Sequence, residues 1–172
     1  MKKIIRFPLV LGVVALCSGL LLAGTYNLTE KTIRENKVER QTAALKGLFD
    51  KIDDSDELAL DDMDKEKGIT NGVKIVSGGK TYYAYQITFE DLQGAEKTSF
   101  ILVLNDKGAI ENLKFVSLGD TYAEKYNSDK FVNSIKDITL IGKDMITTGA
   151  TNTGIPMFEA INQAIDNYGR VK

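Results

Sequence analysis

The middle of the chain contains two short apolar segments that constrain the fold more than any other part of the sequence. Residues 83–89 alternate large apolar side chains with small or polar ones, which predicts a strand with one buried face. Residues 100–104 read Phe-Ile-Leu-Val-Leu, and such a continuous apolar run is typical of a strand covered on both faces. Together they predict a β-sheet as the core of this part of the chain.

Turn residues lie beside both segments. Ser77-Gly78-Gly79 predicts a hairpin turn before the first segment, and Asn105-Asp106-Lys107-Gly108 predicts a tight turn after the second. Residues 109–118 then return, with Leu113 and Phe115 on one face. This order of strands and turns predicts an antiparallel meander.

Helical patterns follow the meander. Ser128 and Asp129 suit the start of a helix that carries three apolar side chains, namely Phe131, Val132 and Ile135. A second helix is predicted near the C-terminus, with Thr153 as its N-cap, Pro156 in its first turn and Gly169 at its end. Its apolar stripe consists of Phe158, Ile161, Ile165 and Tyr168. We therefore expect an α+β fold, an antiparallel sheet with helices packed on it.

The N-terminal region is apolar enough to interact with a membrane. An uncharged stretch from Phe7 to Thr29 has an apolar centre of roughly 18 residues, near the lower limit for a helix that spans a bilayer. A cleaved signal peptide is the alternative, but small residues are poorly placed for cleavage around Ala23 and Gly24. We expect a retained membrane anchor over residues 1–28.

The charges around this span predict its orientation. Lys2, Lys3 and Arg6 precede it, and the positive-inside rule places such cations in the cytoplasm. We therefore expect a single-pass protein of the cell membrane, with residues 30–172 outside the cytoplasm.

A polar region, residues 29–71, follows the span. It begins with a pattern that predicts a helical stalk and ends with an acidic segment at residues 53–67. The acidic residues lack the spacing of an EF-hand calcium loop, so we interpret this segment as a solvated linker. The predicted organisation is an anchor at residues 1–28, a stalk and linker at 29–71, and a folded domain at 72–172.

Composition argues against several classes of site. The chain has one cysteine and no histidine, which leaves too few ligands for haem, iron–sulfur or zinc sites. Its net charge of −2 comes without a basic stripe, so nucleic-acid binding is not expected. Electron chemistry in this chain would therefore need an organic cofactor.

The most informative motif is Asp-Met-Ile-Thr-Thr-Gly-Ala-Thr at residues 144–151, called the octet below. Its small residues form a turn that leads into the amphipathic C-terminal segment. A helix start of this kind presents free backbone N–H groups and the positive end of the helix dipole, which suits an anionic group such as a phosphate. On these residues alone, the alternative is an ordinary helix start whose threonine hydroxyls only satisfy backbone donors.

The octet resembles the flavinylation motif of the RnfG/NqrC family, Asp-x-x-(Ser/Thr)-(Ser/Thr)-Gly-Ala-(Ser/Thr). In that family the last hydroxyl carries FMN as a phosphoester, installed by a dedicated flavin transferase. The resemblance implies that Thr151 carries covalent FMN and that residues 72–172 are an FMN-binding domain. The remaining attachment segment would be Thr147, Thr148, Gly149 and Ala150.

The residue types of the octet suit these roles. Gly149 can take a positive φ, and Ala150 leaves the approach to the neighbouring hydroxyl unhindered. The hydroxyl of Thr151 is a weak nucleophile, so attachment needs the transferase. The resemblance implies that Asp144 is recognised by that enzyme, and a helix-cap or turn carboxylate is the alternative.

Two other segments bear on the resemblance. Residues 7–36 resemble the beginning of RnfG subunits, where an apolar helix runs into a Thr-Glu-x-Thr-Ile type sequence. RnfG and NqrC proteins usually have a His-x-Glu-Thr-Pro-Gly-Leu-Gly type loop beside the flavin ring, of which residues 117–124 keep only the Leu-Gly and the acid-Thr pair. The candidates for ring contacts are therefore Leu118, Gly119 and Thr121, with Tyr122 or Tyr126 packing on the ring. For the two tyrosines, ordinary packing is the alternative.

The resemblance implies an electron carrier that is a subunit of an Rnf-type ion-translocating oxidoreductase, with the membrane subunits of that complex as partners. Two alternatives stay open. The first is a free-standing flavinylated protein that passes electrons to extracellular acceptors, which the missing glycine-rich loop favours and the RnfG-like N-terminus opposes. The second is an anchored binding module without a cofactor.

Overall fold

The computed structural model of the chain describes residues 15, 18, 45, 47–92, 94, 97–119, 121–146 and 149–172. Almost all of the predicted membrane span and stalk lies outside these residues. The chain divides into two units, Met1–Leu45 and Lys46–Lys172, and the second is described below. Within the described part of the chain, no helix is both long and apolar enough to cross a membrane.

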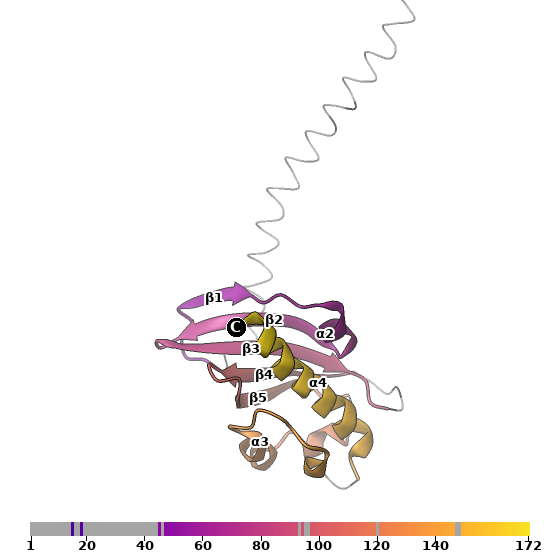
Figure 1. The fold of residues 1–172 in the computed structure, drawn as a ribbon. Helices are drawn as coiled ribbons and strands as arrows, with labels where there is room; N and C mark the ends of the chain where they lie inside the picture. Colours follow the sequence, from indigo (N-terminus) through magenta and orange to yellow (C-terminus); the bar gives the residue numbers. More distant parts are fainter. Residues whose placement is uncertain are drawn as a thin grey trace, which may run out of the picture. The chain divides into compact units, whose positions relative to one another are not determined.

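Five strands form an antiparallel sheet in the order β1-β2-β3-β4-β5 (Figure 1). The strands are β1 Asp54–Glu57, β2 Ile69–Ser77, β3 Lys80–Phe89, β4 Thr98–Asn105 and β5 Ile110–Ser117. Gly78, Gly79 and Gly108 take φ values of 56°, 76° and 77° in the connecting turns. This left-handed backbone matches the twist of the paired strands. The predicted meander is confirmed.

The main core lies on one face of the sheet. The four inward side chains predicted for β3, at positions 83, 85, 87 and 89, are at most 7% exposed. In β4, all five residues from 100 to 104 are at most 3% exposed, so this strand is covered on both faces as predicted. Full burial of one large apolar side chain stabilises a fold by about 1.5–3 kcal/mol. These two strands therefore anchor the domain.

Helices cover the core face. The longest helix among the described residues, α4 (Thr151–Val171), crosses the sheet diagonally and ends near β2 (Figure 1). Its predicted stripe packs into the core, with Phe158, Ile161 and Tyr168 buried and Ile165 partly buried. The shorter α3 (Asp129–Ile135) begins as predicted, because the Ser128 Oγ accepts the Phe131 N–H at 3.3 Å. The α+β prediction is confirmed for the described residues.

Both ends of α4 differ from the prediction. The helix begins at Thr151 because the chain reverses at Gly149, whose φ is 77°, and Ala150 becomes the N-cap. Thr153 is buried within the first turn and is not the N-cap. The helix also continues through Gly169 to Val171. Its last turn is held because Arg170 forms ion pairs with two aspartates outside α4.

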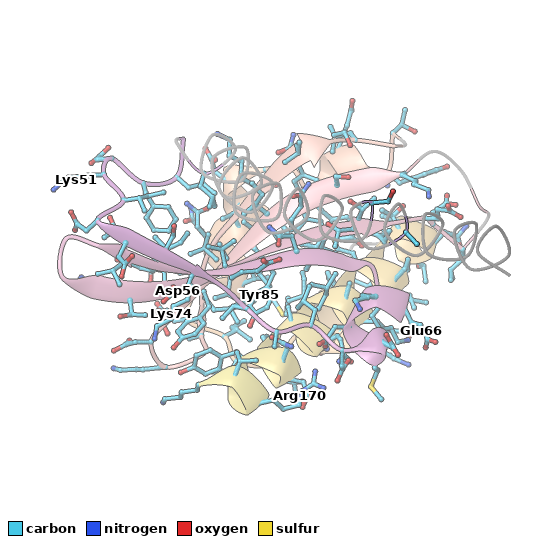
Figure 2. All side chains as sticks on the ribbon, turned by 90° about the horizontal axis from the view of Figure 1, so that it is seen from above. Lys51, Asp56, Glu66, Lys74, Tyr85 and Arg170 are labelled. Carbon is cyan, nitrogen blue, oxygen red and sulfur yellow. The ribbon has the colours of Figure 1, made fainter. Side chains whose placement is uncertain are left out.

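The acidic segment forms regular structure, so its interpretation as a solvated linker is wrong for these residues. β1 pairs with β2 along its whole length, in a register that sets Asp56 opposite Lys74 (Figure 2). The short helix α2 (Asp62–Glu66) begins with a capping box in which Asp61 and Asp64 each accept the other's backbone N–H. Asp61 and Asp64 therefore cap α2, and both also pair with Arg170.

Candidate functional site

The octet lies where α4 begins. Asp144 belongs to a single 3-10 turn, η2 (Lys143–Met145), and Thr151 is the exposed first residue of α4. Thr147 and Thr148 lie outside the described residues. The predicted attachment residue is thus at a helix start that faces solvent.

The backbone at this helix start has amides that the helix itself does not use. The first helical hydrogen bond runs from the Gly154 N–H to the Ala150 carbonyl at 2.8 Å. The amides of Thr151 and Asn152 precede this bond, so no carbonyl of α4 accepts them. Ala150 has no polar side chain to cap them. Such a start favours a negatively charged group.

Tyr126 fixes the position of the helix start from the core side. Its ring is fully buried and packs edge-on against Phe131 and Phe158, with centroid distances of 5.0 and 5.7 Å. Its hydroxyl donates to the Ala150 carbonyl at 3.2 Å and occupies the space where a Cβ on Gly154 would lie. Tyr126 is therefore a core residue, and the interpretation of its ring as a surface for the flavin is wrong.

Tyr122 and Lys125 lie on the exposed side of the same segment. Tyr122 is the N-cap of the 3-10 turn η1 (Ala123–Lys125) and Lys125 is its last residue, and the Lys125 Nζ lies 5.3 Å from the centre of the Tyr122 ring. The same nitrogen is 3.2 Å from the position that a Cβ on Gly149 would occupy. Lys125 was not among the residues predicted for the site. Nothing local in the sequence marks it, because its proximity to the octet depends on the tertiary fold.

Pro156 connects the helix start to a loop. Proline has no N–H, so the Asn152 carbonyl four residues earlier receives no hydrogen bond from it. The Leu92 N–H, in the connection between β3 and β4, donates to this carbonyl at 3.1 Å. The Leu92 side chain remains 59% exposed. Pro156 was predicted in the first turn of the helix, but it lies after that turn. Because it has no N–H, the Asn152 carbonyl can accept the Leu92 N–H and so fix the loop between β3 and β4.

The predicted ring-contact residues follow β5. Leu118 and Gly119 are half-buried, and the Gly119 N–H donates to the Thr98 Oγ1 at 3.0 Å. Thr121 is exposed, and residue 120 lies outside the described residues. The chain then continues into η1 and reaches the octet through Lys125 and Tyr126. The role of Leu118, Gly119 and Thr121 in binding the ring stays a prediction.

Asp144 is exposed, and its carboxylate folds over Gly142 within the same turn. This conformation is that of a turn carboxylate. Because the side chain also remains accessible, recognition by a transferase stays a prediction.

A surface hollow of about 480 Å³ borders the first half of α4. Its charged lining consists of Lys65, Lys67, Lys97, Glu66, Glu90 and Glu159. Two pairs among them form ion pairs, Lys67 with Glu159 at 2.8 Å and Lys97 with Glu90 at 3.3 Å. Because positive and negative side chains are balanced, the hollow offers no selective attraction for a phosphate.

A buried polar cluster lies at the other end of α4. The Asp64 carboxylate is inaccessible to solvent and accepts hydrogen bonds from Gln163 at 2.8 Å, Asn167 at 2.7 Å and Arg170 at 2.6 Å. Tyr85 extends from β3 of the sheet (Figure 2). Its hydroxyl donates to the Asn167 Oδ1 of α4 at 3.0 Å. These contacts join α2, β3 and α4. We interpret the cluster as structural, because its members bond to one another.

The ionisation of this cluster follows from its contacts. Burial opposes the charge on Asp64, but the hydrogen bonds from Gln163, the Asp61 N–H, Asn167 and Arg170 outweigh it and lower the pKa of the carboxyl. Burial is also the main reason why the pKa of Tyr85 lies far above its usual value, and the Asp64 charge adds to this effect. Asp64 is therefore a stable anion and Tyr85 a neutral donor.

The similarity to a known family lies at the N-terminal end of the chain, away from the octet. Residues 1–48 match the family model described as the RnfG N-terminal region. This match includes the segment, residues 7–36, whose sequence resembles RnfG subunits, and it does not include the octet. Comparison with curated proteins gave no match. The predicted resemblance is confirmed for the N-terminal region.

Proposed function

We propose that this chain is a membrane-anchored electron carrier of the RnfG family, with FMN bound to Thr151 through a phosphoester. The match of residues 1–48 to the RnfG N-terminal region supports the family. The chain acts as a subunit of an Rnf-type ion-translocating oxidoreductase and exchanges electrons with membrane subunits of that complex. The observation that carries the proposal is the exposure of Thr151, the last hydroxyl of the octet, at the first position of a 21-residue helix.

The residues around Thr151 fit a bound phosphate. The amides of Thr151 and Asn152 precede the first helical hydrogen bond, and Gly149 leaves the backbone accessible. Tyr126 and Leu92 hold the helix start from two directions through the Ala150 and Asn152 carbonyls. The chain's own contribution is therefore to hold the phosphate at a fixed point. The FMN supplies transfer of one or two electrons.

Attachment requires a flavin transferase. The Thr151 oxygen forms a bond to the phosphorus of a flavin pyrophosphate, the bond to the leaving nucleotide breaks, and the hydroxyl proton passes to a base of the transferase. An unperturbed threonine hydroxyl does not perform this step unaided. Asp144 serves in recognition by the transferase, which its exposure permits.

The N-terminal region confines the domain to the membrane surface. The predicted span over residues 1–28 keeps residues 30–172 outside the cytoplasm. Confinement to a thin layer raises the effective concentration of the cofactor at its partner subunits without any new contact.

The test is coexpression of the full chain with a flavin transferase, followed by intact mass measurement and in-gel flavin fluorescence. The wild-type chain should gain the mass of one FMN phosphoester and fluoresce after denaturation. Thr151→Val should lose the label completely, because it removes the nucleophile, whereas Thr151→Ser should retain it. Thr139→Val is the matched control, since Thr139 is also exposed and lies outside the octet.

Other outcomes distinguish the alternatives. Full labelling of Thr151→Val would reject the attachment residue. A wild-type chain that stays unlabelled in the presence of active transferase would favour the binding module without a cofactor. A labelled chain that does not copurify with membrane subunits of an Rnf complex would favour the free-standing carrier.

A further inference from the structure

We propose that Leu92 packs against the isoalloxazine ring of the FMN that Thr151 carries. The inference rests on the proposed function and assigns a ring contact to a residue outside the octet and outside the loop after β5. It depends on a backbone hydrogen bond beside the attachment residue, on two loops that meet at one end of the sheet, and on the exposure of one leucine side chain.

Leu92 lies beside the attachment residue. Its N–H donates to the Asn152 carbonyl at 3.1 Å, and Asn152 directly follows Thr151 in the chain. Standard backbone dimensions then place the Leu92 nitrogen at most about 10 Å from the Thr151 Cα. In FMN the ring is joined to the phosphate by a flexible ribityl chain. A ring attached at Thr151 can therefore reach a side chain at this distance.

The same end of the sheet carries the loop in which ring contacts were predicted. Strand β3 ends at Phe89 and β4 begins at Thr98, and these two residues pair in the sheet. The Gly119 N–H, in the loop after β5, donates to the Thr98 Oγ1 at 3.0 Å. Leu92, in the connection between β3 and β4, and Gly119 therefore belong to neighbouring loops. The start of α4 is bonded to the first of these loops.

Leu92 combines a fixed backbone with an accessible apolar side chain. The bond to Asn152 holds its main chain against α4, although the residue remains 59% exposed. Removal of apolar surface from water is favourable, roughly in proportion to the area covered. The aromatic ring of a flavin provides a flat, largely apolar surface for this purpose. The leucine is thus placed to hold the ring at the end of the sheet.

Leu140 provides a matched comparison. It is 69% exposed, so it also presents an accessible leucine side chain. Its neighbour Ile141 is bonded through both backbone groups to the Asn162 side chain of α4. Asn162 lies about 16 Å along the helix axis from Thr151. Leu140 therefore tests whether any exposed leucine influences the flavin, or only the one beside the helix start.

The experiment uses the full chain, coexpressed with a flavin transferase and purified in detergent, with the label verified by intact mass. The variants are Leu92→Ala, Leu92→Met and, as the control, Leu140→Ala. Two quantities are measured on the native labelled protein: the acrylamide quenching constant of the flavin fluorescence, and the anisotropy of that fluorescence. Leu92→Ala should raise the quenching constant about twofold and lower the anisotropy, because it removes one partly exposed apolar contact to the ring. Leu92→Met keeps an apolar contact of similar size and should resemble the wild type.

The denatured labelled protein gives the reference for a ring without contacts, and all variants should agree there. A native Leu92→Ala chain with the wild-type quenching constant and anisotropy would overturn the inference while leaving the proposed function intact. Equal changes in Leu140→Ala would also overturn it, because the effect would then not depend on the helix start. An unlabelled wild-type chain would instead reject the proposed function on which the inference rests.

Discussion

The two ends of α4 use polar groups in opposite ways. Near the C-terminal end, Asp64 is buried and accepts hydrogen bonds from three side chains of the helix. At the N-terminal end, Thr151 is exposed and the first amides are not used by the helix. The buried end joins three elements of the domain, and the exposed end retains capacity for a further group. The same helix thus combines a stabilising contact with a candidate attachment site.

This difference predicts which measurements each end should affect. Changes at the Asp64 cluster should alter the free energy of unfolding and leave flavin labelling intact in molecules that fold. Changes at the octet should alter labelling with a small effect on stability. The predictions below test this separation, from the largest expected effect to the smallest.

Asp64→Asn should lower the free energy of unfolding by about 3 kcal/mol. The substitution removes the charge that Arg170 requires and replaces one acceptor with a donor, and loss of one partner in a buried pair has this order of cost. Urea unfolding of the full chain, followed by circular dichroism, measures the effect. Asp62→Asn is the control, because its side chain is 98% exposed in the same helix. Equal stability of the two variants would contradict the structural role of the cluster.

The contribution of Asp64 should disappear at acidic pH. Folding lowers the pKa of this carboxyl, so its stabilisation is complete well above the ordinary value of 3.8 and is lost as pH falls through that value toward the folded-state pKa. The difference in unfolding free energy between wild type and Asp64→Asn should therefore be largest near neutral pH and shrink below pH 3.8. A constant difference down to the acid limit would show that packing, and not charge, is responsible.

Gly149→Ala should cost about 1 kcal/mol, because an L-residue is disfavoured at its φ of 77°. Gly79→Ala provides a matched control, since Gly79 has a φ of 76° and open space around it. Both variants should lose similar stability, but only Gly149→Ala should slow flavin labelling in the coexpression assay. Slower labelling in both would mean that strain anywhere in the domain has this effect.

Pro156→Ala should have the most local effect, at one loop contact, because the new helical N–H competes with an existing hydrogen bond. The new donor competes with the Leu92 N–H for the Asn152 carbonyl. Hydrogen exchange at the Leu92 amide should therefore accelerate. The Thr88 amide, bound to the Gly68 carbonyl at 2.8 Å, should exchange at its original rate. Unchanged exchange at Leu92 would show that the loop does not depend on the proline.

The sequence predicted the parts of the fold that depend on local periodicity. The alternation in β3, the apolar run in β4 and the cap at Ser128 each arise from neighbouring residues, and the structure confirms them. The Asp64 cluster was missed because its partners are 99 to 106 residues away in the chain. Until those partners are known, a segment rich in aspartate resembles a solvated linker.

The candidate site was likewise predictable only where its residues are neighbours in the sequence. The octet itself is contiguous, so Thr151, Gly149 and Ala150 could be identified from the sequence. The start of α4 was misplaced because Thr153 is a better capping residue than Ala150, and the choice depends on the backbone conformation of Gly149. Lys125 could not be found from the sequence. The turn that contains it is brought to the octet by the buried Tyr126, whose contact with Ala150 depends on the tertiary fold.

One outer edge of the sheet, β1, and the start of the other, β5, are poor templates for another strand. β1, at one edge, is four residues long, and three of them are acidic. At the other edge, β5 exchanges two backbone hydrogen bonds at Ile110 with residues 137 and 138. Short, charged or occupied edges discourage strand addition between molecules. The domain should consequently resist self-association through these parts of its sheet even when many copies are crowded together.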